Sequence, residues 1–198
     1  MKDRGLLILR TTTGGLLAGH GAQKLFGAFD GPGLDGTARM LESLELRPGR
    51  AWAPVAGLAE LGGGLLTALG LFNPLGPVAI ISAMTMAALT AHRGKPIWVT
   101  AGGAELPLTY ASNALAIALT GPGRYSLDAA LRIRLSARGV AFAIAAAATG
   151  LALGLGPRLR REARLRRRES LARGGREGRD LPTQAETAVQ RARRAGGI

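Results

Sequence analysis

The chain has 198 residues and a mass of 20.4 kDa, a length that fits one domain. It contains no cysteine, which excludes disulfides, thiolate metal sites, iron–sulfur clusters and dithiol redox relays built from its own side chains. Lys and Arg number 26 against 13 Asp and Glu, and half of these cations lie in residues 157–198. The positive charge therefore belongs mainly to the C-terminal tail, and the rest of the chain is close to neutral.

Metal-ligating residues are also scarce. Only two histidines are present, His20 and His92, so a three-histidine site would need carboxylate ligands. Met84 and Met86 lie two residues apart on one predicted helix and so face different directions, which favours packing over copper or haem ligation. We expect no metal site.

Five apolar segments are long enough to cross the roughly 30 Å hydrocarbon core of a bilayer as helices. They are residues 5–27, 51–72, 74–92, 104–121 and 139–156. The first has a long apolar stretch that contains Arg10, and no small-x-small cleavage site follows it, so we expect a retained helix rather than a signal peptide. A soluble helical bundle is the alternative. It is disfavoured because residues 61–86 and 139–156 carry no charge, whereas helices of small soluble domains keep a polar face.

The connections between these segments differ in length. Asn73-Pro74 predicts a tight turn, so the second and third helices should form an antiparallel hairpin. The connection over residues 28–50 contains glycine and proline breakers and then an amphipathic stretch, residues 37–46, which we expect at the membrane surface. After the fourth segment, Ser126 is expected to cap a short helix whose leucines face lipid and whose arginines face phosphates: Leu127, Leu131, Leu135, Arg132 and Arg134.

Four motifs occur in order along the first two thirds of the chain. They are Arg10, the run GHGAQKLFG (residues 19–27), the glutamate of AELGGGLLTALGL (residues 59–71) and GPGRYSLD (residues 121–128). Together, over about residues 6–131, they resemble the DoxX family of small bacterial and archaeal membrane proteins. The resemblance implies a four-helix membrane core. For some members it implies an association with oxidoreductase systems, including a thiosulfate:quinone-linked one, but it implies no settled catalytic residues.

These patterns predict an all-α, polytopic membrane helical bundle. We expect a DoxX-like four-helix domain at residues 1–136, an additional transmembrane helix at 137–157 and an Arg-rich tail at 158–198 that begins as a juxtamembrane helix and is largely disordered. The tail arginines should bind anionic lipid headgroups: Arg158, Arg160, Arg161, Arg164, Arg166, Arg167 and Arg168. Nucleic-acid binding is disfavoured, because the tail has no folded motif and no aromatic stacking platform. The positive-inside rule places the tail in the cytoplasm of a bacterial cell, and this assignment depends on the tail alone.

Ionisable residues inside the apolar segments cluster toward one side of the predicted bundle. Helical spacing places His20, Gln23 and Lys24 on one face of the first helix, and Glu60 lies at a similar depth in the second as their counter-ion. We hypothesise a pocket for a small polar molecule or a quinone head group, lined by His20, Gln23, Lys24, Glu60, Glu105 and Asn113. The alternative is that Glu60 with Lys24 or His20 is a buried locking pair, while Arg10, His92 and Glu105 only reach toward the headgroups.

Two functions of different classes remain open. The first is a DoxX-like subunit or accessory of a membrane oxidoreductase system, whose pocket meets a quinone or a small sulfur species and whose electrons move through partner proteins or a bound cofactor. The second is a non-catalytic scaffold, an assembly factor or a small-solute carrier. In neither case do we expect this chain to be a complete redox enzyme on its own, and a homo-oligomer is compatible with both.

Overall fold

The structure is a computed structural model that describes residues 1–177, 193–194 and 196. The chain divides into two compact units, Met1–Leu155 and Gly156–Ile198. In chain order the helices are α1 (Lys2–Phe26), η1 (Ala28–Asp30), α2 (Gly33–Ser43), α3 (Gly49–Leu69), α4 (Leu75–Thr90), η2 (Val99–Ala101), α5 (Glu105–Thr120), α6 (Leu127–Leu131) and α7 (Ala137–Glu177). No strand occurs in the part of the chain that is described, which confirms the all-α fold class.

Each of the five apolar segments predicted from the sequence contains a helix: α1, α3, α4, α5 and the first part of α7. Glycines in the left-handed conformation end α1 and α3, at Gly27 (φ 69°) and Gly70 (φ 62°), as expected where a helix must stop abruptly. α7 does not end at Gly156 but continues through Pro157 to Glu177, so the start of the predicted tail is helical. The disorder expected of residues 178–192, 195 and 197–198 concerns positions outside the described residues.

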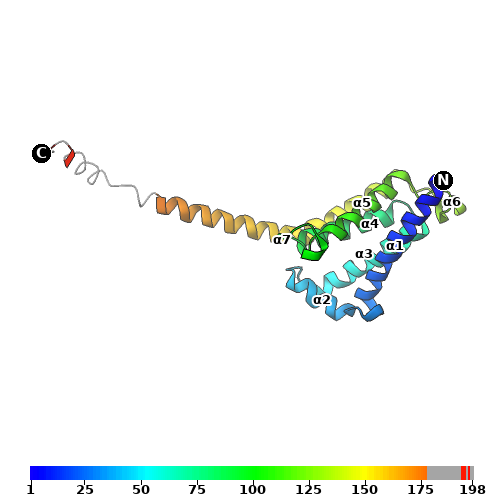
Figure 1. The fold of residues 1–198 in the computed structure, drawn as a ribbon, viewed down its shortest axis with the longest axis horizontal. Helices are drawn as coiled ribbons and strands as arrows, with labels where there is room; N and C mark the ends of the chain where they lie inside the picture. The colour runs from blue at the N-terminus through cyan, green and yellow to red at the C-terminus, as the bar shows by residue number, and fades with distance from the viewer. Residues whose placement is uncertain (178–192, 195, 197–198) are drawn as a thin grey trace. The chain divides into compact units, whose positions relative to one another are not determined.

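The first unit is a bundle in which α1 packs along α3, α3 also contacts α2 and α4, and α4 pairs with α5 (Figure 1). One core cluster joins α1, α4 and α5 through Leu17, Ile80, Met84 and Ala114. A second cluster joins α2 to α3 through Ala38, Leu41, Leu46 and Ala53. Met86 of α4 packs against this second cluster, so α2, α3 and α4 meet around one apolar region.

Small residues set the distance between α1 and α3. A Cβ atom on Gly14 would lie 2.4 Å from the Gly64 carbonyl oxygen, and one on Gly21 would lie 2.2 Å from the Leu61 nitrogen. Where α3 meets α4, a Cβ on Gly76 of α4 would lie 2.7 Å from the Thr67 nitrogen. The two helix pairs thus approach backbone to backbone, the kind of contact that small residues permit in membrane helix bundles.

Two short elements differ from their predicted form. α2 begins at Gly33 rather than near Thr37, and Thr37, Ala38 and Leu41 are buried, so one of its faces packs into the bundle. Thr37 is fully buried and its Oγ1 donates to the Lys24 carbonyl at 3.2 Å. α6 begins with the predicted cap, in which the Ser126 Oγ accepts from the Ala129 nitrogen at 3.2 Å, but it ends at Leu131. Arg132 leaves the helix in the left-handed conformation (φ 55°), so Arg134 and Leu135 are not on its faces.

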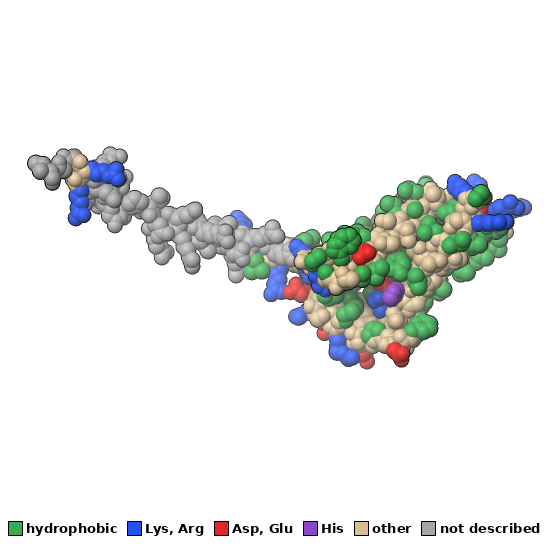
Figure 2. Space-filling model, viewed as in Figure 1, with side chains coloured by type: hydrophobic (Ala, Val, Ile, Leu, Met, Phe, Trp, Pro, Cys, Tyr) green, Lys and Arg blue, Asp and Glu red, His purple; other side chains and the backbone are tan. Residues whose placement is uncertain are grey.

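Two helices of the described residues are long and apolar enough to cross a membrane, Gly49–Leu69 and Ala137–Leu165, and Leu75–Thr90 is apolar but shorter. Large hydrophobic side chains are also exposed on the bundle, among them Ile8, Leu16, Val55, Leu58, Leu115, Leu119 and Phe142. Figure 2 shows hydrophobic side chains spread over the face of the first unit turned to the viewer. Such exposure is unfavourable in water, and it supports a membrane location for this unit.

Candidate functional site

An ion pair between α1 and α3 marks the centre of the predicted pocket. The Lys24 Nζ donates to the Glu60 Oε2, so Lys24 rather than His20 is the partner of this glutamate. The Glu60 side chain is 8% exposed and that of Lys24 is 21% exposed. Burying these two charges costs desolvation energy, which their mutual attraction offsets. Removing either partner would leave the other as a buried, unpaired charge.

A cavity of about 290 Å³ lies beside this pair. Its walls come from α2, α3 and α4, with Lys24 of α1 and Gly150 of α7 completing them. Most of the lining is apolar: Met40, Leu41, Leu44, Leu46, Trp52, Val55, Ala56, Ala59, Ala83, Met86, Ala87 and Ala91. The polar groups that reach it are Lys24, Glu60, Ser82, Thr90 and His92. The cavity therefore has an amphipathic lining, with one ion pair among hydrophobic walls.

The other residues of the predicted pocket lie elsewhere. His20 is exposed, and its Nδ1 lies 3.0 Å from the Gln23 Oε1 on the same helix face. Glu105 accepts a hydrogen bond from the Val99 nitrogen at 2.8 Å and so stabilises the turn before α5. Asn113 donates to the Thr13 hydroxyl at 3.4 Å. Of the six predicted pocket residues, the cavity lining therefore contains Lys24 and Glu60.

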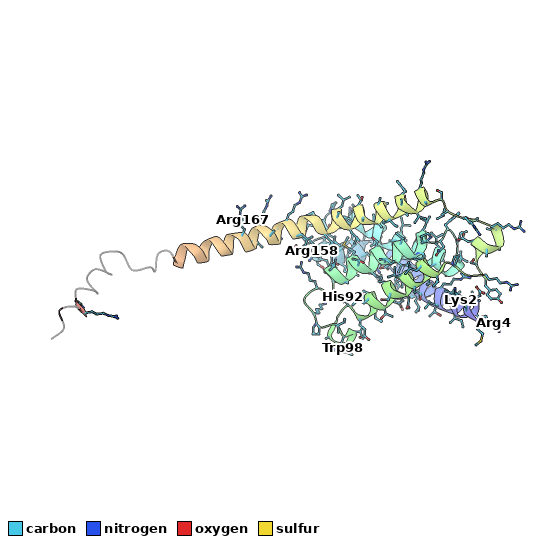
Figure 3. All side chains as sticks on the ribbon, turned by 90° about the horizontal axis from the view of Figure 1, so that it is seen from above. Lys2, Arg4, His92, Trp98, Arg158 and Arg167 are labelled. Carbon is cyan, nitrogen blue, oxygen red and sulfur yellow. The ribbon has the colours of Figure 1, made fainter. Side chains whose placement is uncertain are left out.

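His92, Ser82 and Thr90 are polar residues of the cavity that were not among the predicted pocket residues, and His92 is the ionisable one. It follows the end of α4, and its Nδ1 lies 2.7 Å from the Gly102 carbonyl oxygen, across the loop that leads to α5. This hydrogen bond joins the two ends of the loop and holds the ring at the cavity. Figure 3 shows His92 and Trp98 at one end of the bundle, with Lys2 and Arg4 at the other.

The apolar wall formed by α2 and the residues after it was also missed. Leu41 and Leu46 belong both to the core cluster between α2 and α3 and to the cavity lining. The amphipathic pattern of residues 37–46 gives this stretch an apolar face and predicts that the stretch lies at the membrane surface. The structure places part of that face against the cavity instead.

At the opposite end of α3, Arg10 and Asp128 hold the GPGRYSLD motif to the bundle. Arg10 is 2% exposed and its guanidinium donates to the Ala68 and Tyr125 carbonyls, so it does not reach toward headgroups as the alternative interpretation held. The Asp128 carboxylate accepts from the backbone nitrogens of Phe72 and Asn73, each at 2.8 Å. Both side chains satisfy backbone groups where α3 ends and α4 begins, which assigns the motif a structural role.

The tail arginines fall on the second part of α7. Arg158, Arg160, Arg161, Arg164 and Arg167 are described, whereas the side chains of Arg166 and Arg168 lie outside the described part of the chain. Among the residues that the structure describes, no group of three or more His, Asp or Glu side chains is arranged to hold a metal ion.

Comparison with known proteins gives one match. A family model described as DoxX matches residues 5–93, which contain α1 except its first three residues, α2 to α4, and every cavity residue except Gly150. The GPGRYSLD motif lies beyond the matched residues. No curated protein and no solved structure matches the chain.

Proposed function

We propose, from the match of residues 5–93 to the DoxX family model, that the protein is a multi-pass membrane subunit or accessory of an oxidoreductase system. In this proposal the cavity beside Lys24 and Glu60 receives a quinone or a small polar or sulfur species. Electrons pass through partner proteins or a bound cofactor, because the chain has no cysteine of its own to carry them.

The observation that carries the proposal is the paired charge at a cavity with apolar walls. A locking pair alone would be expected to be packed closely on every side, because empty space beside buried charges gives up favourable contacts. Here Lys24 and Glu60 instead line about 290 Å³ of space together with His92. A ligand there would meet both a hydrogen-bonding end and a hydrophobic wall, the usual composition of a small-molecule site.

The topology that accompanies this function has five spans, formed by α1, α3, α4, α5 and the first part of α7. The tail then lies in the cytoplasm, and its arginines bind anionic headgroups at roughly 1 kcal/mol per cation near the surface. Two reporters test this arrangement, one that is active only in the cytoplasm and one that is active only outside it. Each is fused in turn to the N-terminus and to the C-terminus. Activity of the same reporter at both ends would contradict five spans.

The function is tested by capture of the tagged protein from native membranes, with mass spectrometry of both the proteins and the lipophilic molecules that remain bound. The decisive variant is Glu60→Gln, which keeps the shape of the side chain and removes its charge. Asp35→Asn is the control, because it removes a charge of the same sign from an exposed position of α2. A subunit with a working pocket should retain its abundance in the Glu60→Gln variant and lose the bound molecule, while Asp35→Asn retains both.

The competing function is a non-catalytic scaffold, an assembly factor or a small-solute carrier. The observation in its favour is the buried position of Glu60, because a buried ion pair can serve only to join α1 and α3. If Glu60→Gln removes the protein from the membrane altogether, and the parent protein carries neither a lipophilic molecule nor an oxidoreductase partner, this second function is the correct one.

A further inference from the structure

Apart from Lys24, the polar side chains at the cavity offer hydrogen-bond acceptors, because the hydroxyl hydrogens of Thr90 and Ser82 are already engaged. The Thr90 Oγ1 donates to the Met86 carbonyl at 2.7 Å, and the Ser82 Oγ makes a longer contact of 3.5 Å with the Ala147 carbonyl. Their oxygen lone pairs are left to accept. Glu60 is a carboxylate and can only accept.

His92 adds an acceptor of defined geometry. A carbonyl oxygen cannot donate, so the contact of 2.7 Å with Gly102 requires that the His92 Nδ1 carries the hydrogen. In the neutral imidazole the Nε2 is then the acceptor, and it is the ring nitrogen that remains for a ligand. The chain itself therefore selects the tautomer, through the loop that follows α4.

The charge at the cavity argues against a small anion. Lys24 and Glu60 neutralise each other, and the surrounding wall is mostly aliphatic with Trp52. An anion such as thiosulfate would lose its hydration and would have to compete with Glu60 for Lys24. A neutral molecule with a hydrophobic part loses little hydration and gains the apolar contact.

We infer that the cavity binds a neutral amphiphile with a hydroxyl donor on its head group and an apolar tail, and that the His92 Nε2 accepts the hydroxyl hydrogen. The inference rests on the proposed function and narrows its ligand class. Lys24 donates to the hydroxyl oxygen. The tail is covered by Leu41 of α2, by Leu44 and Leu46 after it, and by Trp52 and Val55 of α3. A quinol and a monoacylglycerol both have this chemistry.

The two tryptophans of the chain make a direct test available. Trp52 lines the cavity, whereas Trp98 is 64% exposed on the loop before α5, so Trp98→Phe leaves Trp52 as the only tryptophan. This variant in detergent, kept free of oxygen, is titrated with decylhydroquinone and with the dimethyl ether of decylhydroquinone. The ether keeps the ring, tail and oxygens and lacks the hydroxyl hydrogens. From the midpoint of the Trp52 emission change, we expect the hydroquinone to bind about tenfold more tightly.

A second variant separates the binding role of His92 from its structural one. In His92→Asn the side-chain amide can replace the Nδ1 as donor to Gly102, but nothing replaces the Nε2. We expect this variant to melt at the parent temperature, to bind the ether as the parent does and to lose the tenfold preference for the hydroquinone. Monoacylglycerol is titrated in parallel, and the tighter of the two donors identifies the natural source of the hydroxyl.

Several outcomes would overturn the inference. One is equal binding of the hydroquinone and its ether by the parent, and another is an unchanged preference in His92→Asn. A saturable response to thiosulfate that the hydroquinone does not displace would also overturn it, while leaving the proposed oxidoreductase function with a sulfur ligand intact. If no probe gives a saturable response, both the inference and the pocket of the proposed function are wrong.

Discussion

Gly64 lies at one of the close approaches of α3 to α1, and its replacement by alanine tests whether that contact holds the bundle together. The added Cβ would lie 2.5 Å from the Ala18 nitrogen and 2.6 Å from the Gly14 carbonyl oxygen. Both are backbone atoms of α1 and cannot rotate away, so the helices must separate by about 1 Å to reach ordinary contact distances. Overpacking of this kind costs about 1–3 kcal/mol, and a backbone clash belongs at the upper end.

Gly62 provides the matched control, because it lies two residues earlier in α3 and a Cβ there would meet nothing within 4 Å. Alanine is favoured over glycine in a helix by about 0.8–1.0 kcal/mol, and both variants gain this amount. Gly64→Ala should therefore be destabilised by about 2 kcal/mol, whereas Gly62→Ala should be stabilised by up to about 1 kcal/mol.

The assay is the fraction of detergent-solubilised protein that remains monodisperse by size exclusion after heating. For a chain of this size, a change of 1 kcal/mol in the free energy of unfolding shifts the melting midpoint by about 2–4 °C. The midpoint should therefore fall by about 4–8 °C in Gly64→Ala and rise by about 2–4 °C in Gly62→Ala. Equal midpoints for the two variants would show that α1 and α3 do not approach as closely as the structure has them.

Three further predictions concern charges and the exposed loop. Asp128→Asn should lower stability by about 1.5–3 kcal/mol in the same heating assay, because an amide has a single acceptor oxygen for two backbone N–H groups; an unchanged midpoint would refute the structural role of the motif. Lys24→Glu should cost about 3 kcal/mol and reduce abundance in the membrane, and the double variant Lys24→Glu/Glu60→Lys should recover most of it. Failure of the double variant to improve on the single one would mean that the two charges do not interact. Trp98, 64% exposed beside exposed Ile and Val side chains, should lie at the membrane interface; in a Trp52→Phe background its emission should be quenched by brominated lipids, and quenching by aqueous acrylamide alone would contradict this.

The sequence alone predicts the positions of the long helices because their signals are local. Apolar runs bounded by glycine, proline or charge predict α1, α3, α4, α5 and the start of α7, and the turn at Asn73-Pro74 predicts how two of them pair. Helical spacing also predicts that Glu60 is the counter-ion of the His20, Gln23 and Lys24 face, but it leaves open whether His20 or Lys24 pairs with it, and the tertiary structure selects Lys24.

The tertiary structure decides which other polar residues join that pair, because loops and buried side chains are positioned by contacts distant in sequence. His92 reaches the cavity only because the loop after α4 folds back to Gly102, while Glu105 turns to Val99 instead. Arg10 is buried only because Ala68 and Tyr125, far along the chain, present carbonyls to it. Helical periodicity determines the face of a helix on which a side chain lies, and the neighbour that this face meets is determined by packing.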